Sequence, residues 1–308
     1  YKRQPIDLAT KPFIPFMPLQ TLLACLVFLF AWNLRADPIR ILFLGHESEH
    51  HNSNEYYPML AKALGRDAIY FDYLTSVNQA LDDEEYLNRF DGLLLYANHP
   101  KLTAVQWKNL LGFVRGGKGF VPVHCASWCF SNIPEYDQLV GGRFKSHQGA
   151  VFSPRIVAEG HPAVSGVDKL EAWDETYFHT RHNPKDRTVL MVRDAMPGDP
   201  HEKPEPWTWV RTEGKGRVFY TASGHDERVW SKPEFHQLLK QGILWAVGDQ
   251  VRERYDGFLA NRVPLEYEKR DHVPNYEKRP EPLPFQLPLS PEESMKHTQV
   301  PVGFKLEL

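Results

Sequence analysis

The sequence predicts an α/β protein built on a doubly wound, mostly parallel sheet. Between residues 39 and 123, short apolar runs that fit buried strands alternate with segments whose apolar residues recur at helical spacing. Gly45 and Gly65 close the first strand and the first helix. Parallel strands need crossover connections, and the helices that supply these connections cover both faces of the sheet.

The elements of this first half follow one another without long gaps. Thr103 and Gln106 have the spacing of a capping box, which favours a helix that begins there and ends near Arg115. The predicted strands span residues 39–44, 68–73, 92–96 and 119–123, and the predicted helices span residues 54–64, 81–90 and 103–115.

Beyond residue 150 the pattern changes to several strands followed by one helix. The runs 207–211 and 217–222 flank a glycine-rich loop, which is typical of a hairpin. Pro233 opens the closing helix, which ends before Gly248. Two further strands are predicted at residues 152–158 and 188–192.

The bulk composition is that of a soluble globular protein. Hydrophobic residues make up 42% of the 308 residues, and charged residues make up 24%. The net charge of −3 argues against a nucleic-acid partner. Cys125 and Cys129 are spaced like neighbours on a helix face, so we predict buried free thiols and no disulfide framework.

The first 36 residues have the composition of an export signal. Lys2, Arg3 and Lys11 precede an apolar run over residues 22–32, which is too short to span a bilayer but fits the hydrophobic region of a secretory signal. We therefore predict a signal peptide or membrane anchor over residues 1–36, and a periplasmic or extracellular protein. A buried first helix is the alternative.

Short motifs in a fixed order run through the middle of the chain. They are Gly45-His46, the run Gly119-Phe-Val-Pro-Val-His124-Cys-Ala-Ser127, Gly141-Gly142 with Phe144 and His147, His161-Pro162, Asp174-Glu175 with Tyr177, Pro206-Trp207, and the run from Gly214 to Tyr220 followed by Gly224-His225. Through these motifs the chain resembles the ThuA-like (trehalose-utilisation) family over residues 37–249. The resemblance implies the flavodoxin-like fold of the class I glutamine amidotransferase superfamily.

Amidotransferases of that superfamily carry a cysteine nucleophile at a sharp turn between a strand and a helix. In this chain the strand ends at His124, and Cys125 comes one residue too late to point into the crevice. Pro122 stands where the family commonly has a glycine, which tightens the turn. We therefore do not expect cysteine-dependent amidotransferase chemistry.

Several histidines follow predicted strands, at the edge of the sheet where ligands bind in such folds. His46 follows the first strand, His124 the fourth, and His225 the strand at 217–222. We expect His124, Glu175 and His225 to be catalytic. The expected substrate-binding residues are His46, His147, Asp174, Tyr177 and Trp207.

Neighbouring residues on a strand face opposite sides, so only one of Asp174 and Glu175 can serve the crevice, and Glu175 is preferred. His50-His51 and the pair His179 and His182 are interpreted as solvated loop residues, with His179 close enough to Glu175 to be its partner.

Two kinds of chemistry suit these residue types. Histidine titrates near neutral pH and a carboxylate can fix its tautomer, which favours general acid–base catalysis. Histidine and carboxylate ligands can also hold a divalent metal ion, although no local ligand spacing such as His-Glu-x-x-His occurs. The sequence leaves both open.

The resemblance implies a small-molecule carbohydrate substrate. A hydrolase or lyase that acts on trehalose-type or keto-glycosides, with His124 as acid or base, is the first hypothesis. A sugar-binding or accessory domain of a larger secreted sugar dehydrogenase is the second, and a scaffold domain the third.

Prolines and charged residues alternate from about residue 250, which favours an extended linker over residues 250–308. Residues 287–308 resemble the entry to a secreted β-propeller dehydrogenase. We therefore expect the start of a truncated following domain there, and a fused or associated propeller as a partner.

Overall fold

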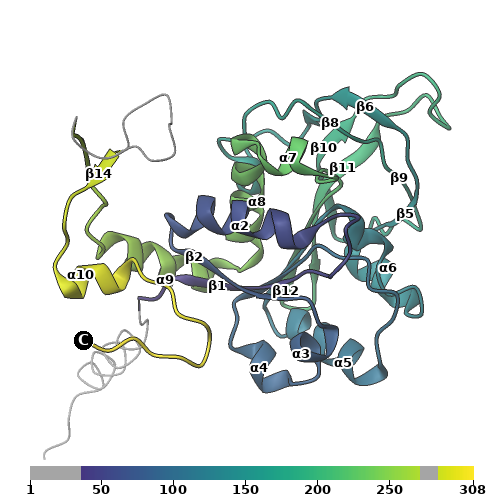
Figure 1. The fold of residues 1–308 in the computed structure, drawn as a ribbon. Coiled ribbons are helices and arrows are strands. Elements are labelled where there is room, and N and C mark those ends of the chain that lie inside the picture. The colour runs from purple at the N-terminus through teal and green to yellow at the C-terminus, as the bar shows by residue number, and fades with distance from the viewer. Residues whose placement is uncertain (1–35, 271–283) are drawn as a thin grey trace, which may run out of the picture. The chain divides into compact units, whose positions relative to one another are not determined.

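The computed structural model describes residues 36–270 and 284–308. The predicted export signal therefore lies outside the described residues. The described residues from Asp37 onward form one compact unit, which Figure 1 shows as a ribbon. None of the helices in the described ranges is long and apolar enough to cross a bilayer.

An eight-stranded sheet runs through this unit. Its order is β2 (Ile69–Leu74), β1 (Ile39–Leu44), β3 (Gly92–Leu95), β4 (Gly119–Pro122), β12 (Gly216–Thr221), β11 (Glu205–Glu213), β10 (Arg187–Arg193) and β7 (Arg155–Ile156). The strands from β2 to β12 pair in parallel, and the rest pair antiparallel. The order β2-β1-β3-β4 is that of flavodoxin-like sheets, so the predicted fold class is confirmed.

Helices cover both faces of the sheet. In Figure 1, α2 (Ser53–Gly65) and α8 (Pro233–Ala246) lie on one side, and α3 (Val77–Leu81), α4 (Glu84–Asn88) and α5 (Ala104–Arg115) lie on the other. The capping box predicted at Thr103 opens α5. The single helix predicted at 81–90 is instead two short helices, because Asp83 caps a new start by accepting from the amides of Glu85 and Tyr86.

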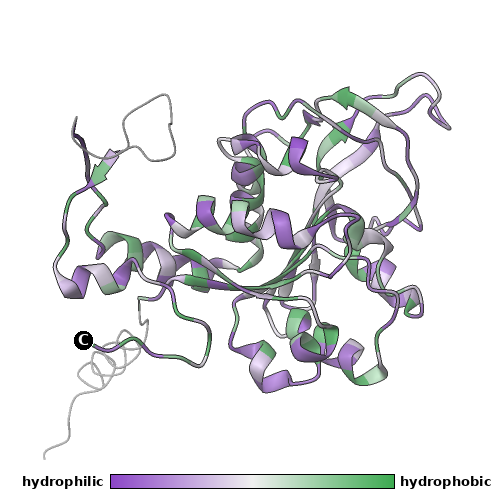
Figure 2. Ribbon diagram, in the orientation of Figure 1, coloured by the Kyte–Doolittle hydropathy of each residue, from purple (hydrophilic) through white to green (hydrophobic). Residues whose placement is uncertain are grey.

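The central strands are buried on both faces, as parallel strands between two helix layers must be. Leu93, Leu94 and Leu95 of β3 are almost fully buried. Figure 2 shows these strands as mostly hydrophobic, and both colours on the flanking helices. Short apolar strands bounded by glycine are therefore the main source of the core.

Three two-stranded sheets accompany the main one in the described residues, and one of them pairs β13 (Tyr267–Lys269) with β14 (Pro284–Gln286). The other two lie near His124. They pair β5 (Arg143–Ser146) with β9 (Phe178–Thr180) and β6 (Gly149–Phe152) with β8 (Ala172–Glu175). The remaining elements near them are α6 (Pro134–Val140), α7 (Glu227–Trp230) and the short 3₁₀ helices η1 (His124–Trp128) and η2 (Pro162–Val164). Glu175, at the end of β8, reaches the end of β4 through contact with His124.

The region predicted as an extended linker contains α9 (Asp249–Ala260), β13 (Tyr267–Lys269), β14 (Pro284–Gln286) and α10 (Pro291–Lys296). Tyr255 of α9 is buried and donates to the carbonyl of Asp67 at 2.6 Å. The amide of Val302 donates to Asp72 of the edge strand β2 at 2.7 Å. Val251, Phe258 and Leu259 of α9 also pack against the core at helical spacing, so this part of the segment is an amphipathic helix.

Candidate functional site

The chain makes a sharp turn where β4 ends. His124 follows with φ of 47°, in the left-handed region that residues other than glycine seldom adopt. Its carbonyl accepts from the hydroxyls of Ser127 at 3.0 Å and Tyr220 at 3.2 Å, and η1 begins directly at His124. The turn has the strand–turn–helix form expected at this position. Such strained residues cluster at functional sites.

The ring of His124 points toward Glu175 but is completely covered. Its side chain is 0% exposed, it stacks on Tyr177 with ring centres 4.1 Å apart, and its Nε2 lies 3.2 Å from Glu175 Oε2. On the other side, Nδ1 lies 2.6 Å from the carbonyl oxygen of Ala222. The expected projection of this ring into an open groove does not occur, because Tyr177 covers it.

The thiol of Cys125 lies in the core. Burial raises its pKa well above the ordinary value, and burial raises the pKa of Cys129 to about 12. A reactive cysteine needs partial exposure and a depressed pKa. Both cysteines of the turn are therefore packing residues.

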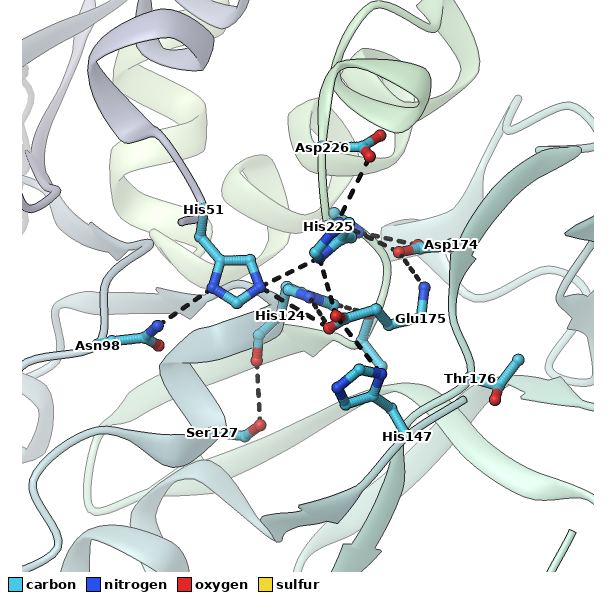
Figure 3. A network of polar contacts seen from close by, with 12 residues as sticks. His51, Asn98, His124, Ser127, His147, Asp174, Glu175, Thr176, His225 and Asp226 are labelled. Carbon is cyan, nitrogen blue, oxygen red and sulfur yellow. Dashed lines mark hydrogen bonds and ion pairs between the residues drawn. The ribbon is translucent and has the colours of Figure 1, made fainter. Parts of the chain in front are cut away.

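Four residues from separate segments converge beside the turn (Figure 3). His51, His124, Glu175 and His225 each offer one nitrogen or oxygen atom, and these four atoms all lie within 4.8 Å of one another. His225 Nδ1 is 3.2 Å from Glu175 Oε1 and 3.3 Å from His51 Nε2. His51 Nε2 is 3.8 Å from Glu175 Oε2. The donor set, three imidazoles and one carboxylate, can hold a divalent metal ion.

His51 is buried, which contradicts its interpretation as a solvated loop residue. Its φ is 56°, and its carbonyl oxygen lies 2.8 Å from Nε2 of His46. The amide of Asn98, after β3, donates to Nδ1 of His46 at 3.3 Å. Since that nitrogen accepts, Nε2 of His46 carries the hydrogen and donates to His51, so His46 supports the loop and does not line the pocket. Burial lowers the pKa of His51 to about 3, so its ring is neutral.

Asp174 and Glu175 have different partners, as the alternation of side chains along a strand predicts. The carboxylate of Asp174 accepts from the amides of Gly224 at 3.0 Å and His225 at 3.1 Å, which holds the segment that carries His225. Glu175 instead meets the imidazoles. Burial alone raises the pKa of Glu175, but its close contacts with the imidazoles of His124, His225 and His51 outweigh burial and hold the pKa far below its ordinary value. Glu175 is therefore a carboxylate at neutral pH.

His225 has the opposite shift to His51. Burial lowers its pKa, but the hydrogen bond with Glu175 and the charges of Glu175 and Asp226 more than reverse this, so the pKa is raised. Its Nε2 lies 3.9 Å from Asp226 Oδ2.

A cavity of about 240 Å³ opens onto this cluster. It is lined by His50, His51, Asn98, Trp128, Phe144, His147, Glu175 and Tyr177. Trp128 is 49% exposed, and the side chain of His147 is 43% exposed with Nδ1 at 3.4 Å from Glu175 Oε1. The cavity thus combines an aromatic wall with a polar floor. A larger cavity of about 400 Å³ beside Met59 and His236 has no such cluster.

The other expected site residues lie elsewhere. Trp207 is buried in the core, where its Nε1 donates to Ser223 at 2.7 Å, and it does not reach the cavity. His179 pairs with Glu205 at 3.0 Å and with the hydroxyl of Tyr220 at 2.9 Å, and not with Glu175. Sequence reasoning missed the roles of His51 and Glu205, whose partners come from distant segments. Asn98, which lies three residues beyond the end of β3 at the edge of the sheet where ligands bind, was an available signal.

Comparisons with known proteins agree with this architecture. The sequence model of the family described as ThuA, trehalose utilisation, matches residues 40–246. A search of curated proteins finds no match. Crystal structures of ThuA-like proteins from Parabacteroides merdae and Bacteroides uniformis are similar, each with 19% identity and a TM-score of 0.58. Both alignments cover 68% of this chain, with 90% of the first protein and 91% of the second. At this identity the likeness concerns the fold.

Proposed function

Because the chain belongs to the family described as ThuA, trehalose utilisation, we propose that it is an enzyme of carbohydrate catabolism. Its substrate is a trehalose-type glycoside or a keto-glycoside, and its reaction is a hydrolysis or an elimination. The observation that carries this proposal is the cavity beside Glu175, in which the partly exposed His147 contacts that carboxylate at 3.4 Å.

His147 is the residue best placed to move a proton. Its Nδ1 lies between two acceptors, the carbonyl of Gln148 at 3.2 Å and Oε1 of Glu175 at 3.4 Å. Nδ1 therefore carries the hydrogen, and Nε2 of the neutral ring keeps its lone pair. A base so oriented can take a proton from water in a hydrolysis, or from the carbon beside a ketone in an elimination. The side chain of His124 has no exposed surface, so it contacts Glu175 and does not reach the substrate.

The aromatic wall suits a sugar ring. The C–H face of a pyranose packs on an aromatic ring, and the hydroxyls then face the polar floor. Trp128 and Phe144 form an edge-to-face pair with ring centres 5.7 Å apart. A cavity of about 240 Å³ is smaller than the pockets of roughly 300–1,000 Å³ that take drug-sized ligands, so it accommodates a single ring.

The test is turnover of trehalose and of 3-keto-glycosides by the purified protein and by His147→Gln. Loss of a general base lowers the rate by about 10²- to 10⁴-fold. His201→Gln is the matched control, because His201 is 44% exposed and lies 3.5 Å from a different carboxylate, that of Glu205. Equal turnover by His147→Gln and the parent would remove His147 from the mechanism, and no turnover of any glycoside by the parent would end the proposal.

A non-catalytic sugar-binding or accessory domain is the second candidate. The exposed ring of Trp128 beside a covered His124 favours it, because that arrangement can bind a ring without acting on it. Calorimetry distinguishes the two: saturable sugar binding with no product after prolonged incubation supports the accessory domain.

We further propose that the protein is exported and works beside a secreted β-propeller dehydrogenase. The basic and apolar residues before Asp37 and the resemblance at residues 287–308 support this proposal. Cell fractionation tests the location. Co-purification from the periplasmic or culture fraction tests the partner, and a cytoplasmic protein without a dehydrogenase partner would contradict both parts.

A further inference from the structure

We propose that His51, His124, Glu175 and His225 together bind one divalent first-row transition-metal ion such as Zn²⁺. The inference deepens the proposed function. It rests on that function only for the role of the ion in the reaction. Binding itself is argued from the geometry of the four residues and is measured without a sugar.

The hydrogen position on His124 is decided by its surroundings. Nδ1 lies 2.6 Å from the carbonyl oxygen of Ala222, and a carbonyl only accepts, so Nδ1 carries the hydrogen. In the neutral ring, Nε2 then points its lone pair at Glu175 Oε2, 3.2 Å away. Two lone pairs at this distance repel each other unless a cation or a proton lies between them.

The other two imidazoles crowd the same carboxylate, although a hydrogen on Nδ1 of His225 can serve both of its contacts. Nδ1 of His225 faces both Nε2 of His51 at 3.3 Å and Oε1 of Glu175 at 3.2 Å. An arrangement held by protons alone needs a hydrogen shared between His124 Nε2 and Glu175 Oε2, in a place where the two side chains are only 0% and 6% exposed. One dication instead satisfies all four donor atoms at once.

The spacing of the donor atoms fits a metal site. Zinc bonds to nitrogen and oxygen of about 2.0–2.1 Å place the corners of a tetrahedron about 3.3 Å apart. Four contacts among His51, His124, Glu175 and His225, taken over both oxygens of Glu175, measure 3.2 to 3.8 Å, and one donor atom from each residue lies within 4.8 Å of the other three. Small movements of the side chains suffice to seat an ion.

The outer nitrogens of the three imidazoles have polar neighbours, as those of metal-bound histidines do. The carbonyl of Ala222 holds His124, and Asp226 lies 3.9 Å from Nε2 of His225. The amide group of Asn98 lies 3.1 Å from Nδ1 of His51 and can turn its oxygen to accept from that nitrogen.

The backbone is strained at two of the four residues. His51 and His124 both have positive φ, at 56° and 47°. Each such conformation costs about 1–3 kcal/mol, and strained residues of this kind concentrate at ligand sites. The fold thus maintains these two side-chain directions against local preference.

The cavity reaches the cluster through His51 and Glu175, so a bound ion can present a coordination position to it. An ion there can polarise a sugar hydroxyl or carbonyl oxygen while His147 handles the proton. Catalytic zinc sites usually have three protein ligands and one open position, so an ion with these four ligands would take a substrate oxygen as a fifth ligand, by the expansion to five-coordinate geometry that zinc allows.

The first experiment measures metal in the full chain. The protein is purified without added metal, stripped with a chelator, checked by circular dichroism, and titrated calorimetrically with Zn²⁺, Co²⁺, Mn²⁺ and Ni²⁺. We expect a single equivalent to bind, and the Co²⁺ form to show the visible absorption of nitrogen- and oxygen-ligated cobalt. A folded, stripped protein that binds none of the four ions saturably would overturn the inference in favour of a proton-held cluster.

Variants then assign the ligands. His51→Gln and Glu175→Gln each lose more than about 100-fold in metal affinity, and Asn98→Ala, which alters only a ligand's neighbour, loses roughly 10- to 100-fold. His201→Gln keeps the parental affinity, although it removes a similar histidine–carboxylate contact. If His51→Gln and Glu175→Gln bind metal as the parent does, the ion sits elsewhere and the assignment is wrong.

The two proposals fail separately. Metal binding at these ligands without turnover of any glycoside would support the metal site and contradict the proposed enzyme activity. Turnover by a protein that binds no metal does the reverse.

Discussion

His124 and Ala222 lie 98 residues apart in the chain, and the carbonyl of Ala222 accepts a hydrogen bond from Nδ1 of His124 at 2.6 Å. The two residues follow neighbouring parallel strands, whose last bridge pairs Val123 with Thr221. The strand β12 therefore decides which nitrogen of His124 is protonated and which one faces Glu175. Side-chain chemistry at the turn is set by the order of strands in the sheet.

Replacement of Tyr220 by Phe tests the support of the strained turn. The buried Tyr220 hydroxyl lies 3.2 Å from the carbonyl of His124, 3.0 Å from Ser127 Oγ and 2.9 Å from Nε2 of His179. Loss of such contacts in a buried site lowers the free energy of unfolding by about 1–3 kcal/mol. Urea unfolding measures it, with the exposed Tyr267→Phe as the control. A change in Tyr220→Phe no larger than in the control would show that the hydroxyl does not hold the turn.

Alkylation tests the burial of the two thiols. Because burial raises the pKa of both Cys125 and Cys129, iodoacetamide should leave both unmodified in the folded protein and modify both after denaturation. Peptide mass spectrometry assigns the modified positions and separates them from Cys25. Rapid labelling of Cys125 in the native protein, with loss of turnover, would restore cysteine chemistry.

Replacement of Trp128 by Ala tests the aromatic wall of the cavity. The ring is 49% exposed and packs against Phe144 and the guanidinium of Arg143. We expect the sugar dissociation constant to rise by up to about tenfold, equivalent to about 1.4 kcal/mol, with metal affinity unchanged. Val105→Ala, which alters an exposed apolar residue on α5, is the control. Unchanged sugar affinity would place the sugar away from this wall.

The pH dependence of stability tests the buried histidines. Burial lowers the pKa of His236 in the folded protein, partly offset by the Trp230 carbonyl and by Glu234. The unfolded chain, with an ordinary pKa near 6.5, then binds more protons, so stability is lost as the pH falls below about 6.5. His236→Gln does not titrate and flattens the curve of unfolding free energy between pH 7 and 5, by at most about 1.4 kcal/mol per pH unit. Burial also lowers the pKa values of His99 and His179, so their contribution to the pH dependence remains in this variant. A slope identical to the parent's would mean that His236 is not shifted.

Much of the fold followed from local signals. The capping box at Thr103 and the apolar runs that become β1 and β3 each depend on neighbouring residues, and the structure has them where they were predicted. The helix expected at 81–90 breaks at Asp83, where a side chain competes with the periodic pattern. The segment after residue 250 was harder, since Tyr255 of α9 bonds to the turn before β2, and Val302, beyond α10, bonds to Asp72 of β2, and both partners are distant in the sequence.

Only part of the candidate site could be predicted from the sequence. A histidine at the end of a strand and an acidic pair on another strand are patterns that a sequence displays, and His124 and Glu175 do lie 3.2 Å apart. His51 sits in a run of polar residues that is typical of a solvated loop, and contacts with His46 and, from distant segments, with Asn98 and His225 accompany its burial. Trp207 was expected to bind substrate, but its ring is buried in the core.

The sequence by itself determined the alternation of strands and helices, the turn at His124 and the family. These depend on spacing along the chain, and spacing is local. Only the tertiary structure decided that His51 joins His225 and Glu175 around His124, because His51 and His225 come from the loops after β1 and β12 and Glu175 ends β8 of a separate small sheet. It also decided the tautomer of His124, since the acceptor belongs to another strand.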